Sequence, residues 1–110
     1  MTKQEAQIVS FQIIACAGDA YSHFYHAVEL AEEGKYEESE QEFKEGDAQL
    51  VEAHKSQTQL LTAEANNEDM DFSVILIHSQ DHLMTTIMYE RIAKQLVNTI
   101  KRLNDLEKKG

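Results

Sequence analysis

The sequence contains no proline and only four glycines, so few positions can break a helix or form a tight turn. It contains one cysteine, Cys16, which excludes an internal disulfide and fits the reducing cytoplasm, where we place the protein. The simplest role for Cys16 is that of a small buried apolar residue. No apolar run approaches the roughly 20 residues that a membrane-spanning helix needs, and the amino terminus lacks the apolar region of a signal peptide.

Basic residues are scarce as well. Twenty acidic residues face ten basic ones, which gives a net charge of −10. This balance argues against a nucleic-acid surface, which needs a basic stripe, and against a surface for anionic membranes. We therefore expect protein partners and no nucleic acid.

The length of 110 residues predicts a single domain over residues 1–110. Hydrophobic residues make up 42% of the chain, which is enough for a core but a thin one. Small domains with thin cores often gain stability from oligomerisation.

Two interruptions divide the chain into three helices. Gly34 can adopt the left-handed conformation that ends a helix. Asn66 and Asn67 form a second turn, after which Asp69 or Asp71 can cap the next helix. The expected helices span residues 4–33, 36–65 and 72–107. Because the connections are short, we predict an all-α fold with three antiparallel helices in an up-down-up bundle.

The first helix carries two apolar stripes with helical spacing. One stripe consists of Val9, Ile13, Cys16, Ala20, Phe24, Ala27 and Ala31. The other consists of Ile8, Phe11, Ala15, Gly18, Ser22 and Tyr25. Two stripes predict two sets of neighbours, namely the chain's own helices and a second copy of the chain.

The second helix has one apolar face and one acidic face. The apolar face is formed by Tyr36, Phe43, Leu50, Val51, His54, Leu61 and Ala65. The opposite face, with Glu37, Glu38, Glu45 and Glu52, is expected to be solvated. His54 lies on the apolar stripe, and its simplest role is that of a hydrogen-bonded core residue.

The third helix places titrating groups inside an apolar stripe. At about 100° per residue, ten positions share one face of this helix. They are Val74, His78, Asp81, Thr85, Met88, Ile92, Leu96, Thr99, Leu103 and Leu106. His78 and Asp81 lie in the middle of the stripe, and His82 lies at its edge, one turn from His78.

A carboxylate in such a stripe is unfavourable unless it is paired with a cation, a proton or a donor. In a symmetric oligomer, copies of Asp81 would converge on the axis around a shared ion such as Mg²⁺, because hard cations favour oxygen ligands. Alternatively, Asp81 is partly solvated or bonded to a histidine.

His78 admits two kinds of chemistry. A neutral imidazole is a good nucleophile near neutral pH, and a phosphoryl group on it would gain from the nearby helix amino terminus and from a donor on His82 or His54. Alternatively, His78 and His82 have the spacing of zinc ligands, and Asp81 could add an oxygen. From spacing alone the two are equally supported. The pattern argues against a metalloprotease, since HSQDH has a serine where HExxH requires glutamate.

The string HSQDHLMTT, residues 78–86, resembles the active-site segment of the enzyme IIA components of the lactose/cellobiose (diacetylchitobiose) family of the phosphoenolpyruvate-dependent sugar phosphotransferase system. Residues 18–40, GDAYSHFYHAVELAEEGKYEESE, and residues 52–65, EAHKSQTQLLTAEA, are similar to further segments of the same family. The resemblance covers nearly the whole chain in order.

The resemblance implies three chains assembled as a homotrimer, a nine-helix bundle. His78 would accept a phosphoryl group from the phosphocarrier HPr and pass it to a cysteine of the cognate IIB component. IIB would then phosphorylate a β-linked disaccharide, such as cellobiose or lactose, at the membrane component IIC. His82 and Gln80 would support the phosphoryl group. Asp81 would hold one divalent metal per trimer at the three-fold axis, with Mg²⁺ as the expected ion.

Two alternatives to phosphotransfer remain at this point. AEEGKYEESEQEFKEG reads like the turn of a helical repeat, which would make the protein an interaction module, although no period near 34 residues is present. The other alternative is a structural zinc-binding helical bundle.

Overall fold

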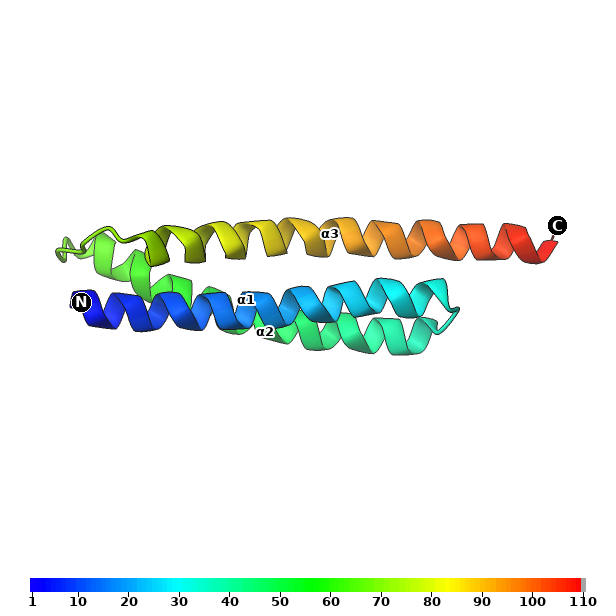
Figure 1. The fold of residues 1–110 in the computed structure, drawn as a ribbon, viewed down its shortest axis with the longest axis horizontal. Helices are drawn as coiled ribbons and strands as arrows, with labels where there is room; N and C mark the ends of the chain where they lie inside the picture. Colours follow the sequence, from blue (N-terminus) through cyan, green and yellow to red (C-terminus); the bar gives the residue numbers. More distant parts are fainter. Residues whose placement is uncertain (110) are drawn as a thin grey trace.

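The computed structural model describes residues 1–109, which form an antiparallel rod of three α-helices without any strand (Figure 1). The helices are α1 (Lys3–Glu32), α2 (Tyr36–Ala65) and α3 (Val74–Lys109). The rod measures 62 × 20 × 17 Å. The predicted all-α class and helix count are confirmed, and each predicted helix end lies within two residues of the observed one. No described helix is both long enough and apolar enough to cross a bilayer.

The turn between α1 and α2 has the expected glycine geometry. Gly34 has φ of 81°, and its amide donates to the carbonyl of Ala31 at 3.0 Å. The amide of Lys35 donates to the carbonyl of Leu30 at 2.9 Å, which completes a Schellman motif. This turn reverses the chain within three residues and sets α2 antiparallel to α1.

The second turn repeats this motif with asparagine. Asn67 has φ of 59°, its amide donates to the carbonyl of Glu64, and the amide of Glu68 donates to the carbonyl of Ala63. The start of α3 differs from the prediction. Ser73, not Asp69 or Asp71, caps the helix, because its hydroxyl accepts from the amide of Leu76 at 3.2 Å.

α1 is the central helix, which contacts both α2 and α3 along its length, while α2 and α3 hardly touch each other. Figure 1 shows α1 and α2 closely paired, with α3 running above them. The first predicted stripe of α1 is buried, with Cys16 only partly so. Ile13, Phe24 and Leu83 are fully buried at the centre of the core. The bundle is therefore open between α2 and α3.

The prediction of which α2 residues form its buried apolar face is partly wrong. Val51 and Leu61 are more than half exposed, and His54 is exposed rather than part of the core. The residues that face α1 include several small ones. The buried set is Ser39, Phe43, Gly46, Leu50, Ala53, Ser56, Leu60 and Ala63. Small side chains allow the two backbones to approach, so the contact follows them rather than the bulkier residues.

The stripe predicted on α3 is not buried in the single chain. The buried face carries Leu76, Ser79, Leu83, Thr86, Ala93, Val97 and Ile100. The predicted stripe points outward, with large apolar side chains that are 42% to 85% exposed in the case of Val74, Met88, Ile92, Leu96, Leu103 and Leu106. The second stripe of α1 is also outward, since Ile8, Phe11 and Tyr25 are more than half exposed. The chain thus leaves two apolar surfaces without an internal partner.

Candidate functional site

The first turns of α3 hold an open hollow of about 330 Å³ against α1. It is lined by Tyr21, His78, Asp81, His82, Thr85 and Thr86. Ser73 starts α3 just before His78, so the chain presents this imidazole one turn inside a helix amino terminus. His78 is exposed and is therefore accessible to a docking protein.

His82 lies beside His78 but is half-buried against α1. The two ring centroids are 5.8 Å apart and the rings meet edge to face. A Cβ placed on Gly18 of α1 would lie 3.9 Å from Cε1 of His82. The Nδ1 atom of His82 is buried without a hydrogen-bond partner among the described residues, which leaves Nε2 as the available ring nitrogen. His82 is thus partly enclosed beside His78, with one ring nitrogen that no described residue satisfies.

Asp81 is exposed on the outward stripe of α3. Within residues 1–109 no cationic group lies within ion-pair distance of its carboxylate. Its backbone carbonyl accepts a hydrogen bond from the Thr85 hydroxyl at 3.0 Å. An unpaired carboxylate among apolar side chains is the donor chemistry that a hard divalent cation requires.

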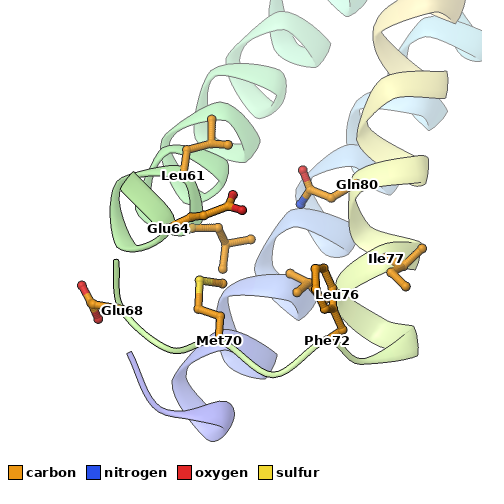
Figure 2. Close-up of a pocket in the computed structure, with 9 residues that line it drawn as sticks. Leu61, Glu64, Glu68, Met70, Phe72, Leu76, Ile77 and Gln80 are labelled. Atoms are coloured by element: carbon orange, nitrogen blue, oxygen red, sulfur yellow. The ribbon is translucent and has the colours of Figure 1, made fainter. Parts of the chain in front are cut away.

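Gln80 is not part of this hollow. Its side-chain carbonyl accepts from the Gln57 amide at 2.8 Å, which ties α3 to α2. Gln80 instead lines a separate, mostly apolar hollow of about 280 Å³. Figure 2 shows Gln80, Leu76 and Phe72 on one side of this hollow, with Leu61 and Glu64 on the opposite side. The structure therefore brings His78, Asp81 and His82 together and places Gln80 on another face of α3.

The zinc alternative is not supported at these residues. In the described part of the chain, the one group whose ligand atoms converge within 4.8 Å is His23, Glu42 and Glu45, on the other side of α1. His78, His82 and Asp81 do not form such a group.

Sequence reasoning missed two residues that line the hollow. Tyr21 extends from α1, where its ring stacks on Tyr89 with centroids 4.6 Å apart. Thr86 is buried, and its hydroxyl donates to the carbonyl of His82 at 2.8 Å. No spacing in the sequence places Tyr21 beside the site, because its position depends on how α1 packs on α3.

Residues 8–101 match the family described as the lactose/cellobiose-specific IIA subunit of the PTS system. The chain belongs to this family. A lactose-specific EIIA component of the PTS from Streptococcus mutans serotype c is 43% identical over 102 residues, which cover 93% of this chain and 98% of that protein. The corresponding protein of Staphylococcus aureus (strain N315) is 41% identical over 102 residues, which cover 93% of this chain and 99% of that protein.

Solved structures of the family agree in fold. The crystal structure of the PTS cellobiose-specific enzyme IIA from Bacillus anthracis has a TM-score of 0.89 and 35% identity, and the match covers 96% of this chain and 94% of that one. The chitobiose IIA protein in solution structures of its complex with HPr, from the N,N'-diacetylchitobiose branch of the Escherichia coli phosphotransferase system, has a TM-score of 0.78 and 28% identity. That match covers 90% of this chain and 96% of that one. The family resemblance of HSQDHLMTT is thus confirmed, and the chain is a component of a sugar phosphotransferase system.

Proposed function

We propose that this IIA component carries a phosphoryl group on His78, accepting it from phosphorylated HPr and passing it to a cysteine of the IIB component. The observation that supports this most directly is the open hollow, in which an exposed imidazole lies beside the half-buried ring of His82. None of the other described histidines combines exposure with this arrangement.

In the first transfer, a ring nitrogen of His78 attacks the phosphorus of the donor's phosphohistidine. A nitrogen–phosphorus bond forms on His78 while the one on the donor breaks, and the donor imidazole leaves with that electron pair. In the second transfer, the thiolate of IIB attacks the same phosphorus, and His78 leaves as a neutral imidazole. The phosphoryl group moves in line both times, so the chain's contribution is positioning and charge stabilisation.

His82 is suited to stabilise the transferred group. His82 is half-buried beside His78, and its Nε2, which makes no hydrogen bond among the described residues, can donate one to a phosphoryl oxygen on His78. Asp81 would instead repel a phosphoryl group, since both lie in the same hollow. A cation on Asp81 removes this repulsion, which is one physical reason for a metal there.

The outward stripes favour a homotrimer. Burial of large exposed side chains such as Met88, Ile92 and Leu96 on α3 needs a further copy of the chain. In this assembly three Asp81 carboxylates meet at the three-fold axis and would hold one divalent metal, of the Mg²⁺ type, which supplies charge compensation there. Tyr25 and Phe11 of α1 would face the neighbouring copy.

The similar proteins support the partners. The chitobiose IIA protein in the complex with HPr supports HPr as the donor for this chain. The lactose-specific and cellobiose-specific relatives support a β-linked disaccharide as the transported sugar. The proposal places the chain in the cytoplasm, where it reaches the membrane only through IIB and IIC.

The proposal is tested by incubation with radiolabelled phospho-HPr. The His78→Gln variant should take up no label, and sedimentation should show the same oligomeric state as for the parent. His54→Gln, a change at another exposed histidine, is the matched control and should be labelled fully. Label on His78→Gln together with its loss from His82→Gln would show that the site is assigned to the wrong histidine.

The two other hypotheses make different predictions. A helical-repeat interaction module would carry no acid-labile phosphate, and a structural zinc bundle would unfold with chelators. Family membership favours the phosphocarrier over both.

A further inference from the structure

A second cluster of titrating side chains connects α1 to α2 and includes no residue of α3. His23 of α1 has Nδ1 2.6 Å from Oε2 of Glu42 and 3.5 Å from Oε2 of Glu45. The donor atoms of these three residues all lie within 4.8 Å of one another. His23 and Glu42 are only 26% and 20% exposed, so the cluster is partly shielded from water.

The spacing of the donor atoms is close to that of a tetrahedral metal site. Bonds of roughly 2.0–2.1 Å to a central Zn²⁺ place neighbouring ligand atoms ~3.4 Å apart. The distance from His23 Nδ1 to Glu45 Oε2, at 3.5 Å, already fits. The contact with Glu42, at 2.6 Å, must lengthen by a fraction of an ångström, which rotation of a glutamate side chain allows.

The surrounding groups are arranged as they are around known metal-bound histidines. Oδ2 of Asp19 lies 3.7 Å from Nε2 of His23, on the far side of the ring from the two glutamates. A metal-bound imidazole commonly directs its other N–H to a carboxylate, and a small rotation of the Asp19 side chain would bring this contact to hydrogen-bond distance. Nδ1 of His26 lies 3.4 Å from Oε1 of Glu42 and can orient the second oxygen of that carboxylate.

A proton competes with a metal for this cluster. The hydrogen bond with Glu42 is the main cause of a raised pKa of His23, and the reciprocal hydrogen bond lowers the pKa of Glu42. A metal must displace the proton from Nδ1, so its affinity falls as the pH falls. The mixed nitrogen and oxygen donors favour Zn²⁺ over Mg²⁺ or Ca²⁺, which prefer oxygen alone.

We propose that His23, Glu42 and Glu45 form a Zn²⁺-type site that links α1 to α2, with water as the fourth ligand and Asp19 orienting the histidine. This site is separate from the Asp81 position, takes a different class of metal and is independent of phosphotransfer. Its bound ion would stabilise the pairing of α1 and α2 in the carboxy-terminal half of α1.

The test uses protein without a histidine tag, freed of metal and titrated with Zn²⁺ by calorimetry, with Co²⁺ as a spectroscopic probe. We expect one Zn²⁺ per chain. Bound Co²⁺ should show a visible absorption band with the intensity typical of a four-coordinate ion. Zn²⁺ should raise the melting temperature, whereas the same concentration of Mg²⁺ should not. The affinity should increase about tenfold per pH unit below the pKa of His23, because one proton is displaced.

Two variants and two controls distinguish this site from others. His23→Gln should abolish the band, and Glu45→Gln, a change at a half-exposed residue that leaves the fold intact, should weaken Zn²⁺ at least tenfold. His54→Gln and the double variant His78→Gln/His82→Gln should bind as the parent does. The proposal is overturned if no saturable binding occurs at millimolar Zn²⁺, or if the band persists in His23→Gln and disappears in the double variant.

Discussion

The histidines on the two sides of α1 have opposite surroundings. On the side that faces α2, His23 and His26 are held by carboxylates, with the closest contact at 2.6 Å. On the side that faces α3, His78 is exposed, and His82 has a buried nitrogen without a partner within residues 1–109. Both sides belong to one acidic chain, yet among the described residues its carboxylates form ion-pair contacts with His23 and His26 and not with His78 or His82.

This difference separates two uses of the same side chain. A histidine already bonded to carboxylates holds its proton and is a poor nucleophile for an incoming phosphoryl group. A histidine without such partners keeps a ring nitrogen available for bond formation. The α2 side of α1 therefore suits a proton or a metal, and the α3 side suits a transferred group.

The largest expected effect is on the rate of phosphoryl transfer, when a histidine beside His78 is changed and a carboxylate-paired histidine serves as the comparison. His82→Gln should slow phosphoryl transfer from HPr by about 10²-fold, because it removes a fixed donor beside the developing charge. His26→Gln should leave the rate unchanged, since the one ion-pair contact of His26 among the described residues is with Glu42, away from the hollow. Rapid-quench measurement of labelling rates tests both. Equal rates for the parent and His82→Gln would mean that His82 has no part in the transfer.

The faces of α1 were predictable from the sequence, and those of α2 and α3 only in part. Helical spacing identifies an apolar stripe, but it does not say whether the stripe meets the same chain or another copy. On α3 the stripe with Met88 and Ile92 is outward, and the buried face is a different set that includes Leu83, Ala93 and Ile100. The turns were predictable because Gly34 and Asn67 are the residues that tolerate positive φ.

The candidate site shows the same division. His78, Asp81 and His82 share a face of one helix, so spacing alone grouped them, and the structure agrees. Gln80 was grouped with them by family resemblance, but its position in the helix directs it to Gln57 on α2. The His23 cluster depends on how α1 and α2 are aligned, which no local pattern specifies.

A second test compares a glycine at the α1–α2 contact, Gly46, with a glycine at the α1–α3 contact, Gly18. A Cβ at Gly46 of α2 would lie 2.4 Å from Cε1 of Phe24, in the tight α1–α2 contact. Gly46→Ala should lower the free energy of unfolding by about 2 kcal/mol, as overpacking does. Gly18→Ala meets His82 at an ordinary 3.9 Å and should raise stability by about 0.5–1 kcal/mol through helix propensity.

Urea denaturation at one fixed protein concentration measures both glycine variants, because oligomers make stability depend on concentration. A neutral Gly46→Ala would show that Phe24 can move aside and that the α1–α2 contact is looser than the structure indicates.

A third test compares an unpaired carboxylate with a paired one. Asp81→Leu should remove the axial divalent metal but keep the assembly, with unfolding free energy unchanged or raised by about 1 kcal/mol, because apolar residues can replace buried charges. Glu42→Gln, measured with a chelator, should instead lower it by somewhat under 1 kcal/mol, since it removes the partner of His23. Sedimentation and metal analysis of Asp81→Leu check the first part. Dissociation into monomers would contradict the proposed role of its stripe.

The smallest effect is the pH dependence of the His23–Glu42 pair in metal-free buffer. The pKa of His23 is raised above its ordinary 6.5, so its stabilisation is fully present below that value and is lost as the pH rises through the folded pKa. The pKa of Glu42 is lowered from 4.5, so its stabilisation is present above that value and is lost as the pH falls through its folded pKa. The difference in the free energy of unfolding between the parent and His23→Gln should therefore be largest between about pH 5 and 6 and decline toward pH 8.

Because water screens this pair, we expect this difference in unfolding free energy, measured by urea denaturation, to stay under about 1 kcal/mol at its maximum. His54→Gln, which changes an exposed histidine of α2, should give a pH profile parallel to the parent's. A parallel profile for His23→Gln as well would show that the carboxylates around His23 do not stabilise its protonated form.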